Sequence, residues 1–394
     1  MNKPTDFEIE LERINKDLSE LKDGTLNNAA ATDGEKATAF AYRLYQRATL
    51  TGNLNGLADA ESAIESAIRQ LSNPVDLYFL KANLDFTLHR VADARRDLLM
   101  MPGLCDSLQG RALLADIDFQ EGRYEEARKG YEAILRDDRT WDNLARLAYF
   151  KTKMGDTAGA EQLYIEAVDE ITAKQMRSYA WVELQRGLLD LTHGHYEGAQ
   201  VHYERAGRAY TGYWLVDEHM AELLGALGRF DEAVALYEKV IARVPRPEFQ
   251  QALGELYVFM GRPAQAEAWF EGALAAYLES AARGDVHYYH HLADFYADVR
   301  EDGQEALKWA QKDASLRNNF STQAALAWAL YRNGQLDEAV EQMNQALSSG
   351  VHDAHLFYQA AIIQQSAGES GAGDKYLHMA AEINPHHRNF HVHR

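Results

Sequence analysis

The chain has few of the residues on which several common protein classes depend. Among its 394 residues there is one cysteine, Cys105, and there are seven prolines. A single thiol excludes an internal disulfide framework, and no Cys-x-x-Cys pair is present for a zinc site of that kind. No stretch of about 18 apolar residues occurs, so the sequence predicts no membrane-spanning helix.

Positive charge is also scarce. Lys and Arg number 40 against 60 Asp and Glu, which gives a formal net charge of -20. Nucleic acids and anionic membranes attract concentrated basic surfaces, and no Lys/Arg stripe appears. The composition therefore argues against both partners and fits a soluble protein with a large exposed surface. Because the N-terminus lacks an apolar run, we expect a cytoplasmic location, or a periplasmic one if a signal peptide has been removed.

The motifs of the common catalytic classes are missing as well. There is no Gly-x-Ser-x-Gly elbow, no His-Glu-x-x-His helix and no dinucleotide fingerprint. The glycine-rich stretch 368–375 lacks the Gly-Lys-Ser/Thr ending of a phosphate loop. The sequence therefore favours a protein that is not an enzyme, has no catalytic residues and requires no cofactor.

The most pronounced feature of the sequence is a periodic recurrence of small residues. Small residues recur at intervals of 33, 34, 39 or 40 residues, and this ladder runs nearly the whole length of the sequence. Its members are Ala60, Ala94, Ala127, Ala160, Ala199, Ala233, Ala266, Ala306, Ala339 and Gly373. Such a period is the signature of a helical repeat array. The two long steps are expected to lengthen second helices, which would then end near Lys174 and Ala282.

Each unit of the array carries two further markers. A second small residue stands twelve positions before most rungs of the ladder, which lets two helices cross closely. Ala293 is one place out of step with this rule, and the unit of Ala306 departs again with Ala310 and Asp313 where a bulky and a small residue are usual. Five positions before the rung, most units have a glycine, which suits a left-handed helix stop. These glycines are Gly122, Gly155, Gly194, Gly228, Gly261, Gly334 and Gly368.

Two stretches carry a family resemblance. Gly-Arg-Tyr-Glu-Glu-Ala at 122–127 and Gly-Arg-Phe-Asp-Glu-Ala at 228–233 resemble the tetratricopeptide repeat family, and the repetition extends the resemblance over roughly residues 35–385. The resemblance implies antiparallel helix pairs stacked into a right-handed superhelix. It also implies that the first helices line a concave groove that commonly binds peptides or protein segments. We therefore predict an all-α solenoid of about ten such repeats.

The periodicity divides the chain into three segments. Residues 1–34 are expected to form an N-terminal amphipathic capping helix and a linker, residues 35–385 the solenoid, and residues 386–394 a His-rich C-terminal tail. The helix is predicted from a 4-3-4-3 spacing of apolar residues. These residues are Phe7, Leu11, Ile14, Leu18 and Leu21.

The repeat alignment also predicts which side chains face the groove. Consecutive first helices contribute an acidic wall, and later ones contribute aromatic residues. Such a surface would favour a basic segment and anchor it through aromatic contacts. The alternative is ordinary surface charge, with some aromatic rings filling the core between helices. The residues assigned to the groove are Glu218, Glu222, Glu248, Gln251, Glu255, Trp328, Tyr331 and Tyr358.

Histidine is unevenly distributed, with ten of its fifteen positions from residue 287 onward. His287, His290 and Asp294 share one helical face at a spacing of i, i+3 and i+7. A shift of one residue would instead turn Tyr288, His291, Phe295 and Asp298 toward the groove. Imidazoles with a carboxylate suit zinc, copper or nickel, whereas the alternative is solvated or hydrogen-bonded histidine. The candidate ligands are His287, His290, Asp294, His355, His391 and His393.

Two functions follow. The leading one is a non-enzymatic scaffold that captures a protein or peptide segment, a basic one by preference, in the acidic, aromatic groove. The alternative is a transition-metal-binding protein, acting as a carrier, a sensor or a metal-dependent enzyme, that uses the C-terminal histidines.

Overall fold

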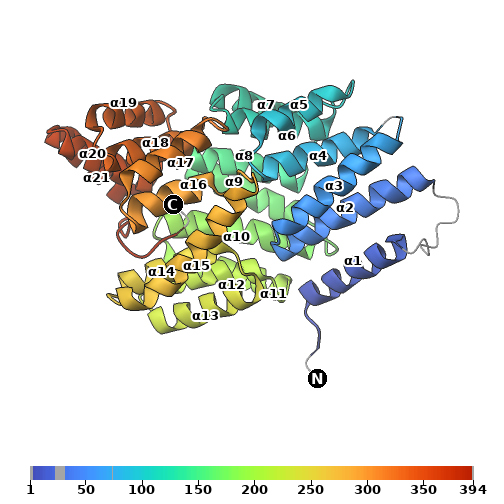
Figure 1. Cartoon of the computed structure of the whole chain (residues 1–394), viewed down its shortest axis with the longest axis horizontal. Helices are drawn as coiled ribbons and strands as arrows, with labels where there is room; N and C mark the ends of the chain where they lie inside the picture. Colours follow the sequence, from blue (N-terminus) through green and yellow to red (C-terminus); the bar gives the residue numbers. More distant parts are fainter. Residues whose placement is uncertain (1–2, 23–31, 73, 393–394) are drawn as a thin grey trace.

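The computed structural model describes residues 3–22, 32–72 and 74–392, and Figure 1 shows how they are arranged. Within these ranges the chain forms twenty-one α-helices, one short π-helical segment and no strand. The prediction of an all-α repeat fold is thereby confirmed. The predicted linker lies outside the described residues except for its last positions, where α2 has already begun. No helix in the described ranges is both long and apolar enough to cross a membrane.

After α1 (Asp6–Lys22), the helices follow one another as ten antiparallel pairs, one pair per repeat. The pairs are α2 (Asp33–Thr51) with α3 (Asn55–Gln70), α4 (Val75–Thr87) with α5 (Val91–Met100), α6 (Leu108–Gln120) with α7 (Tyr124–Asp137), α8 (Trp141–Lys153) with α9 (Thr157–Glu170), α10 (Met176–Thr192) with α11 (Tyr196–Ala209), α12 (Trp214–Ala226) with α13 (Phe230–Arg243), α14 (Pro247–Phe259) with α15 (Pro263–Ala282), α16 (Tyr289–Asp294) and η1 (Phe295–Val299) with α17 (Gly303–Ala314), α18 (Phe320–Arg332) with α19 (Leu336–Leu347), and α20 (Ala354–Ser366) with α21 (Ser370–Ile383).

The small residues of the ladder lie where the two helices of a pair cross. Ala60, Ala127 and Ala233 have no exposed surface, and the other alanine rungs are equally buried. Gly254 shows why bulk is excluded on the facing helix, because an added Cβ would lie 2.5 Å from the ring of Phe270. A large ring four positions after the rung thus fills the space that a missing side chain leaves.

Left-handed turns separate the two helices of a pair, as the glycine pattern predicted. All seven predicted turn glycines have φ between 73° and 84°. In two units another residue stands at the same place: His89, with φ of 63°, and Glu301, with φ of 51°. A side chain in this conformation costs about 1–2 kcal/mol, so both turns are strained.

The out-of-step Ala293 has a structural cause. Helix α16 continues directly into η1, whose wider π-helical turn accommodates one additional residue. Thirteen positions therefore separate Ala293 from Ala306, in place of the usual twelve, and both alanines remain fully buried. The π-helical bulge in the first helix therefore preserves the close packing of the two alanines in this unit.

The two long steps of the ladder have different origins. Helix α15 is lengthened and ends at Ala282, which confirms one prediction. The other prediction was wrong, because α9 ends at Glu170 and the additional residues lie in the connection that follows and in the long first helix α10.

The array winds back on itself, so units far apart in the sequence come into contact. The amide of Asn318 donates to the carbonyl of Gln120 at 2.9 Å, and the amide of His352 donates to the carbonyl of Lys153 at 3.0 Å. Asn319 and Gln120 are joined across 199 residues, which is close to six repeats. In Figure 1 the helices of the second half of the chain, yellow to red, lie against those of the first half.

Helix α1 buries one apolar face against the rest of the array. Its buried residues are Phe7, Ile14 and Leu18, and it packs on α2. It also reaches the middle of the chain, where Tyr210 donates to Glu10 at 2.6 Å. Both α1 and α2 thereby contact the sixth repeat region, since the indole of Trp214 donates to the carbonyl of Leu50 at 3.0 Å.

Candidate functional site

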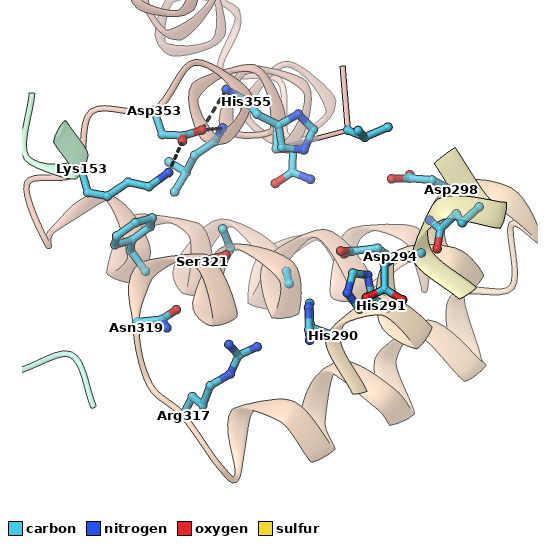
Figure 2. Close-up of a pocket in the computed structure, with 18 of the residues that line it drawn as sticks. Lys153, His290, His291, Asp294, Asp298, Arg317, Asn319, Ser321, Asp353 and His355 are labelled. Atoms are coloured by element: carbon cyan, nitrogen blue, oxygen red, sulfur yellow. Dashed lines mark hydrogen bonds and ion pairs between the residues drawn. The ribbon is translucent and has the colours of Figure 1, made fainter. Parts of the chain in front are cut away.

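The winding of the repeats encloses a cavity of about 430 Å³. First helices supply most of its wall, namely α8, α12, α14, α16, α18 and α20, and Figure 2 shows part of it. Six carboxylates and two cationic side chains line it, which gives an excess of four negative charges when the histidines are neutral. The ionisable residues are Glu218, Glu248, Glu255, Asp294, Asp298, Asp353, Lys153, Arg317, His290, His291 and His355.

One ion pair in the lining of this cavity joins the fourth repeat to the tenth, which lie on successive turns of the superhelix. Lys153 at the end of α8 lies 3.6 Å from Asp353, as the dashed lines in Figure 2 show. Asp353 also caps α20, because its Oδ1 accepts the amides of His355 and Leu356 at 3.0 Å each. Burial opposes ionisation of Asp353, yet Lys153 and these amides hold its pKa below the usual range. The pair is therefore charged and fixed.

Glu248 is a buried carboxylate of the cavity wall that is paired with Arg246. Arg246 donates to its Oε1 through Nε at 2.7 Å. Burial would raise the pKa of Glu248, but Arg246 and His291 outweigh this effect and lower it. Its Oε2 is buried and accepts no hydrogen bond, so part of the acceptor capacity of this carboxylate is unused in the protein.

The structure divides the two alternative histidine faces between cavity and core. His290 and Asp294 line the cavity, and so do His291 and Asp298 of the alternative face. The remaining members lie in the core: His287, Tyr288 and Phe295 are all buried. His287 and Tyr288 precede the first residue of α16, and the π-helical turn begins directly after Asp294, so regular helical spacing holds at neither end of this segment.

His290, His291 and the nearby His287 are neutral at neutral pH. Burial lowers the pKa of His291 and drives that of His290 well below its ordinary value. Burial also lowers the pKa of His287 to about 4. Both ring nitrogens of His287 lack a hydrogen-bond partner. An uncharged imidazole in the core is therefore the ground state of this residue.

The last described residues, 384–392, do not project away from the solenoid. This segment, called here the C-terminal strap, returns from α21 to the inner end of α12. Asn389 donates from its side chain to the carbonyl of Ala226 at 3.1 Å, which satisfies a carbonyl in the last turn of α12. His386 lies beside Tyr196, with ring centroids 5.4 Å apart.

Two residues of the strap are embedded in the groove. Phe390 is 3% exposed and lies over Gly225, where an added Cβ would overlap its ring. The amide of Val392 donates to Oε1 of Glu222 at 2.6 Å. His391 adds a ring nitrogen 3.5 Å from the same oxygen. The strap is thus a peptide held by an aromatic contact, a carboxylate and a helix end.

A second cavity, of about 670 Å³, lies beside the strap. The predicted groove residues Glu255 and Tyr358 line it, together with Phe259 and the strap residues from His387 to His391. It therefore extends the groove past the strap.

The other predicted groove residues occupy different environments. Glu218, Glu248, Gln251 and Glu255 line the first cavity, whereas Glu222 is fully buried beneath the strap. Trp328 is also buried and donates to Asp298 at 2.9 Å. Half-buried Tyr331 packs on that indole, with centroids 5.1 Å apart, and lines neither cavity.

The six predicted metal ligands do not converge on one point, which corrects the predicted grouping. His287 is in the core, His290, Asp294 and His355 line the cavity, His391 lies against Glu222, and His393 lies outside the described residues. In the described part of the chain, the groups close enough to share an ion are His89, His290 and Asp313. His89 was missed because only the winding of the repeats brings the turn between α4 and α5 to α16.

Comparison with protein families identifies two segments as tetratricopeptide repeats, residues 219–281 and residues 321–345. Together with the helix pairs and their turns, these matches define a helical-repeat protein of the tetratricopeptide repeat class. Tetratricopeptide repeats present surfaces to other proteins, which supports an interaction scaffold with protein partners.

Two solved structures are among those that match this chain. The crystal structure of the APC/C hetero-tetramer Cut9-Hcn1 is 19% identical, with a TM-score of 0.44 over 96% of this chain and 79% of that chain. The crystal structure of MamA is 20% identical, with a TM-score of 0.33 over 43% of this chain and 97% of that chain. No curated protein matches the sequence.

Proposed function

We propose that this protein is a scaffold whose concave interior binds a short non-helical segment of a protein partner. The observation that carries the proposal is the C-terminal strap. A segment of peptide already lies on α12, with Phe390 buried and the amide of Val392 bound to Glu222. The groove therefore has the shape and the polar groups that hold a peptide.

The three contacts of the strap are general enough for a foreign segment. An aromatic side chain fills the space above Gly225, a backbone amide meets the carboxylate of Glu222, and a side-chain amide meets the end of α12. Buried aromatic anchors supply much of the affinity in such interfaces. A partner segment with an aromatic residue, two positions before a free backbone amide, satisfies the same groups.

The charge of the lining selects among such segments. The cavity next to the strap contributes an excess of four negative charges, counted above from its lining. Complementary charge accelerates association and disfavours acidic competitors. The preferred partner segment is therefore basic as well as aromatic.

The strap and the partner compete for the same surface. An intramolecular occupant reduces the apparent affinity of a ligand by the fraction of molecules in which the groove is open. Variants that weaken the strap should therefore bind peptide more tightly than the wild type does. This effect distinguishes the groove on α12 from any other peptide-binding surface.

The test uses a fluorescein-labelled peptide of residues 384–394 and fluorescence anisotropy. The full chain carrying Phe390→Ala should bind this peptide at least about tenfold more tightly than the wild-type chain does. A control peptide with Ala in place of its Phe should bind neither protein. Equal binding of the two peptides, or equal affinity of the two proteins, would reject the proposal.

A further inference from the structure

A cluster of three metal-ligating side chains lies where the second repeat meets the eighth. His89 comes from the turn between α4 and α5, His290 from α16 and Asp313 from α17. One ring nitrogen of each histidine and one carboxylate oxygen all lie within 4.8 Å of one another. The two imidazole rings are 5.2 Å apart between centroids. The cluster joins residues more than 200 positions apart in the chain.

Neither histidine has its full set of hydrogen bonds. The Nδ1 atoms of His89 and His290 are both buried, and neither has a hydrogen-bond partner. Buried polar nitrogens are normally paired, because leaving one unpaired loses its bond to water without replacement. Each of the two neighbouring rings thus has a buried nitrogen that is free to take a further partner.

The backbone at His89 is a second, independent sign. This residue occupies the turn position that seven other units give to glycine, and it does so at φ of 63°. Glycine would adopt this conformation without strain. An imidazole retained at a strained position, and directed toward His290, is explained if the side chain itself is needed.

The protonation states of His89 and His290 suit the coordination of a metal ion. Burial, followed by the positive charge of Arg317, drives the pKa of His89 well below its ordinary value. Burial and the neighbouring His291 do the same for His290. Both rings are therefore neutral at neutral pH, which is the form that binds metal ions.

Asp313 is already oriented for a role as ligand. It is 1% exposed, and Arg317 donates to it through Nη2 at 2.8 and 2.9 Å. Thr322 adds a hydroxyl contact at 3.3 Å. Ligating carboxylates commonly accept hydrogen bonds from outer groups of this kind, which fix the carboxylate while leaving lone pairs for the metal. A small apolar residue is usual at this repeat position, so the acid is a departure from the pattern of the unit.

We infer that His89, His290 and Asp313 form a binding site for a divalent transition metal ion, zinc by preference. Two imidazoles and one carboxylate are a frequent donor set for zinc, with a fourth position left for water. Zinc-bound ligand atoms lie about 3.3 Å apart in tetrahedral geometry, so the three atoms close by at most about 1.5 Å on binding. Rotation of the two rings supplies such a movement.

The bound ion would fasten one superhelical turn to the next. His89 belongs to the first turn, whereas α16 and α17 belong to the second, so the ion adds a cross-link to the backbone contacts between them. Ligands that bind only the folded state raise its thermal stability. The inference rests on His89, His290 and Asp313 and not on the proposed function, although His290 lines the same cavity as Val392 of the strap.

The experiment titrates the metal-free full chain with Co²⁺, followed by visible absorption, and with Zn²⁺, followed by calorimetry. We expect one ion per chain and a rise in melting temperature on binding. His89→Gly restores the usual residue of this turn and preserves the fold, and His290→Ala removes the facing ligand. Each variant should weaken binding by at least about tenfold and abolish the thermal shift.

Two control variants separate this site from other histidines. His287→Ala removes a buried imidazole near the cluster, and a triple variant, His386→Ala with His387→Ala and His391→Ala, removes those of the strap. Both controls should bind the ion as the wild type does. The inference is overturned if the wild type binds no ion, if His89→Gly binds normally, or if the triple variant loses the ion.

Discussion

The backbone amide of Val392 donates a 2.6 Å hydrogen bond to Glu222, which lies 170 residues earlier in the chain. Glu222 has no exposed surface, and the residues before Val392 cover it. A hydrogen bond to a carboxylate contributes about 1.5–3 kcal/mol, so this contact alone can decide whether the end of the chain is docked. Helix α12 therefore holds the C-terminal strap of its own chain.

Glu222→Ala should release the strap. The amide of Val392 loses its acceptor, and the fraction of open molecules should rise by at least about tenfold. Hydrogen exchange followed by mass spectrometry would then show faster exchange in the peptide that covers 386–392. Glu232→Ala, which removes an exposed carboxylate on α13, is the matched control and should change nothing there. Slow exchange of the strap in Glu222→Ala would contradict the assigned contact.

Gly225→Ala should also displace the strap, by a steric route. The new methyl group overlaps the ring of Phe390, whereas alanine favours the helix itself by about 1 kcal/mol over glycine. The fold should persist while trypsin cuts faster after Arg388. Gly207→Ala in α11 is the control, because its nearest neighbour lies at an ordinary 3.4 Å. Equal cleavage rates in the two variants would show that Phe390 does not occupy this position.

A pair of turn glycines tests the contact between superhelical turns. Gly122 and Gly334 have φ of 75° and 79°, so alanine is strained by about 1–2 kcal/mol at either one. A Cβ on Gly122 would also lie 2.5 Å from the backbone oxygen of Asn318, whereas nothing lies within 4 Å of one on Gly334. Gly122→Ala should therefore lower the melting temperature further, as measured by circular dichroism. Equal losses would mean that the turns do not touch.

Stability should fall below about pH 6.5. The pKa of His287 is about 4 in the folded protein because of burial, against an ordinary value of 6.5, so the unfolded chain binds more protons between these limits. Unfolding is then favoured progressively as pH decreases from 6.5 to 4, by about 3 kcal/mol for this residue. Urea unfolding of His287→Leu should depend less on pH in this window than that of the wild type. Identical pH dependence would contradict a neutral, buried His287.

The elements that could be predicted from the sequence are those that depend on neighbours within one unit. Gly155 ends its helix because a local turn needs φ of 79°, and Ala160 is buried because its partner helix follows at once. The regular spacing of the small residues predicts both the turn and the buried position. Even the offset of Ala293 was a correct signal of an irregular helix, although its π-helical form could not be deduced from one sequence.

The contacts between distant units could not be predicted in this way. Whether Asn318 meets Gln120 depends on a small rotation from each repeat to the next, summed over six repeats. The sequence therefore placed Glu222 in an acidic wall, without indicating that the strap covers it. It did contain one unused signal, because His89 replaces a glycine at a turn position.

The histidine face shows the same limit at short range. A regular helix would put His287 with His290 and Asp294, but α16 begins only at Tyr289 and His287 lies in the core before it. The cavity instead collects His290 and His291 from adjacent positions. A face that is predicted from helical spacing exists only where the helix itself extends.

The most direct test of the central claim is photo-crosslinking of the 384–394 peptide, with benzoylphenylalanine in place of Phe390, to the full chain carrying Phe390→Ala. If the concave face is the peptide site, the crosslinks will fall in α12 around Gly225, and unlabelled peptide will compete them away. Crosslinks on the outer surface formed by the second helices, or none that unlabelled peptide removes, would contradict the assignment.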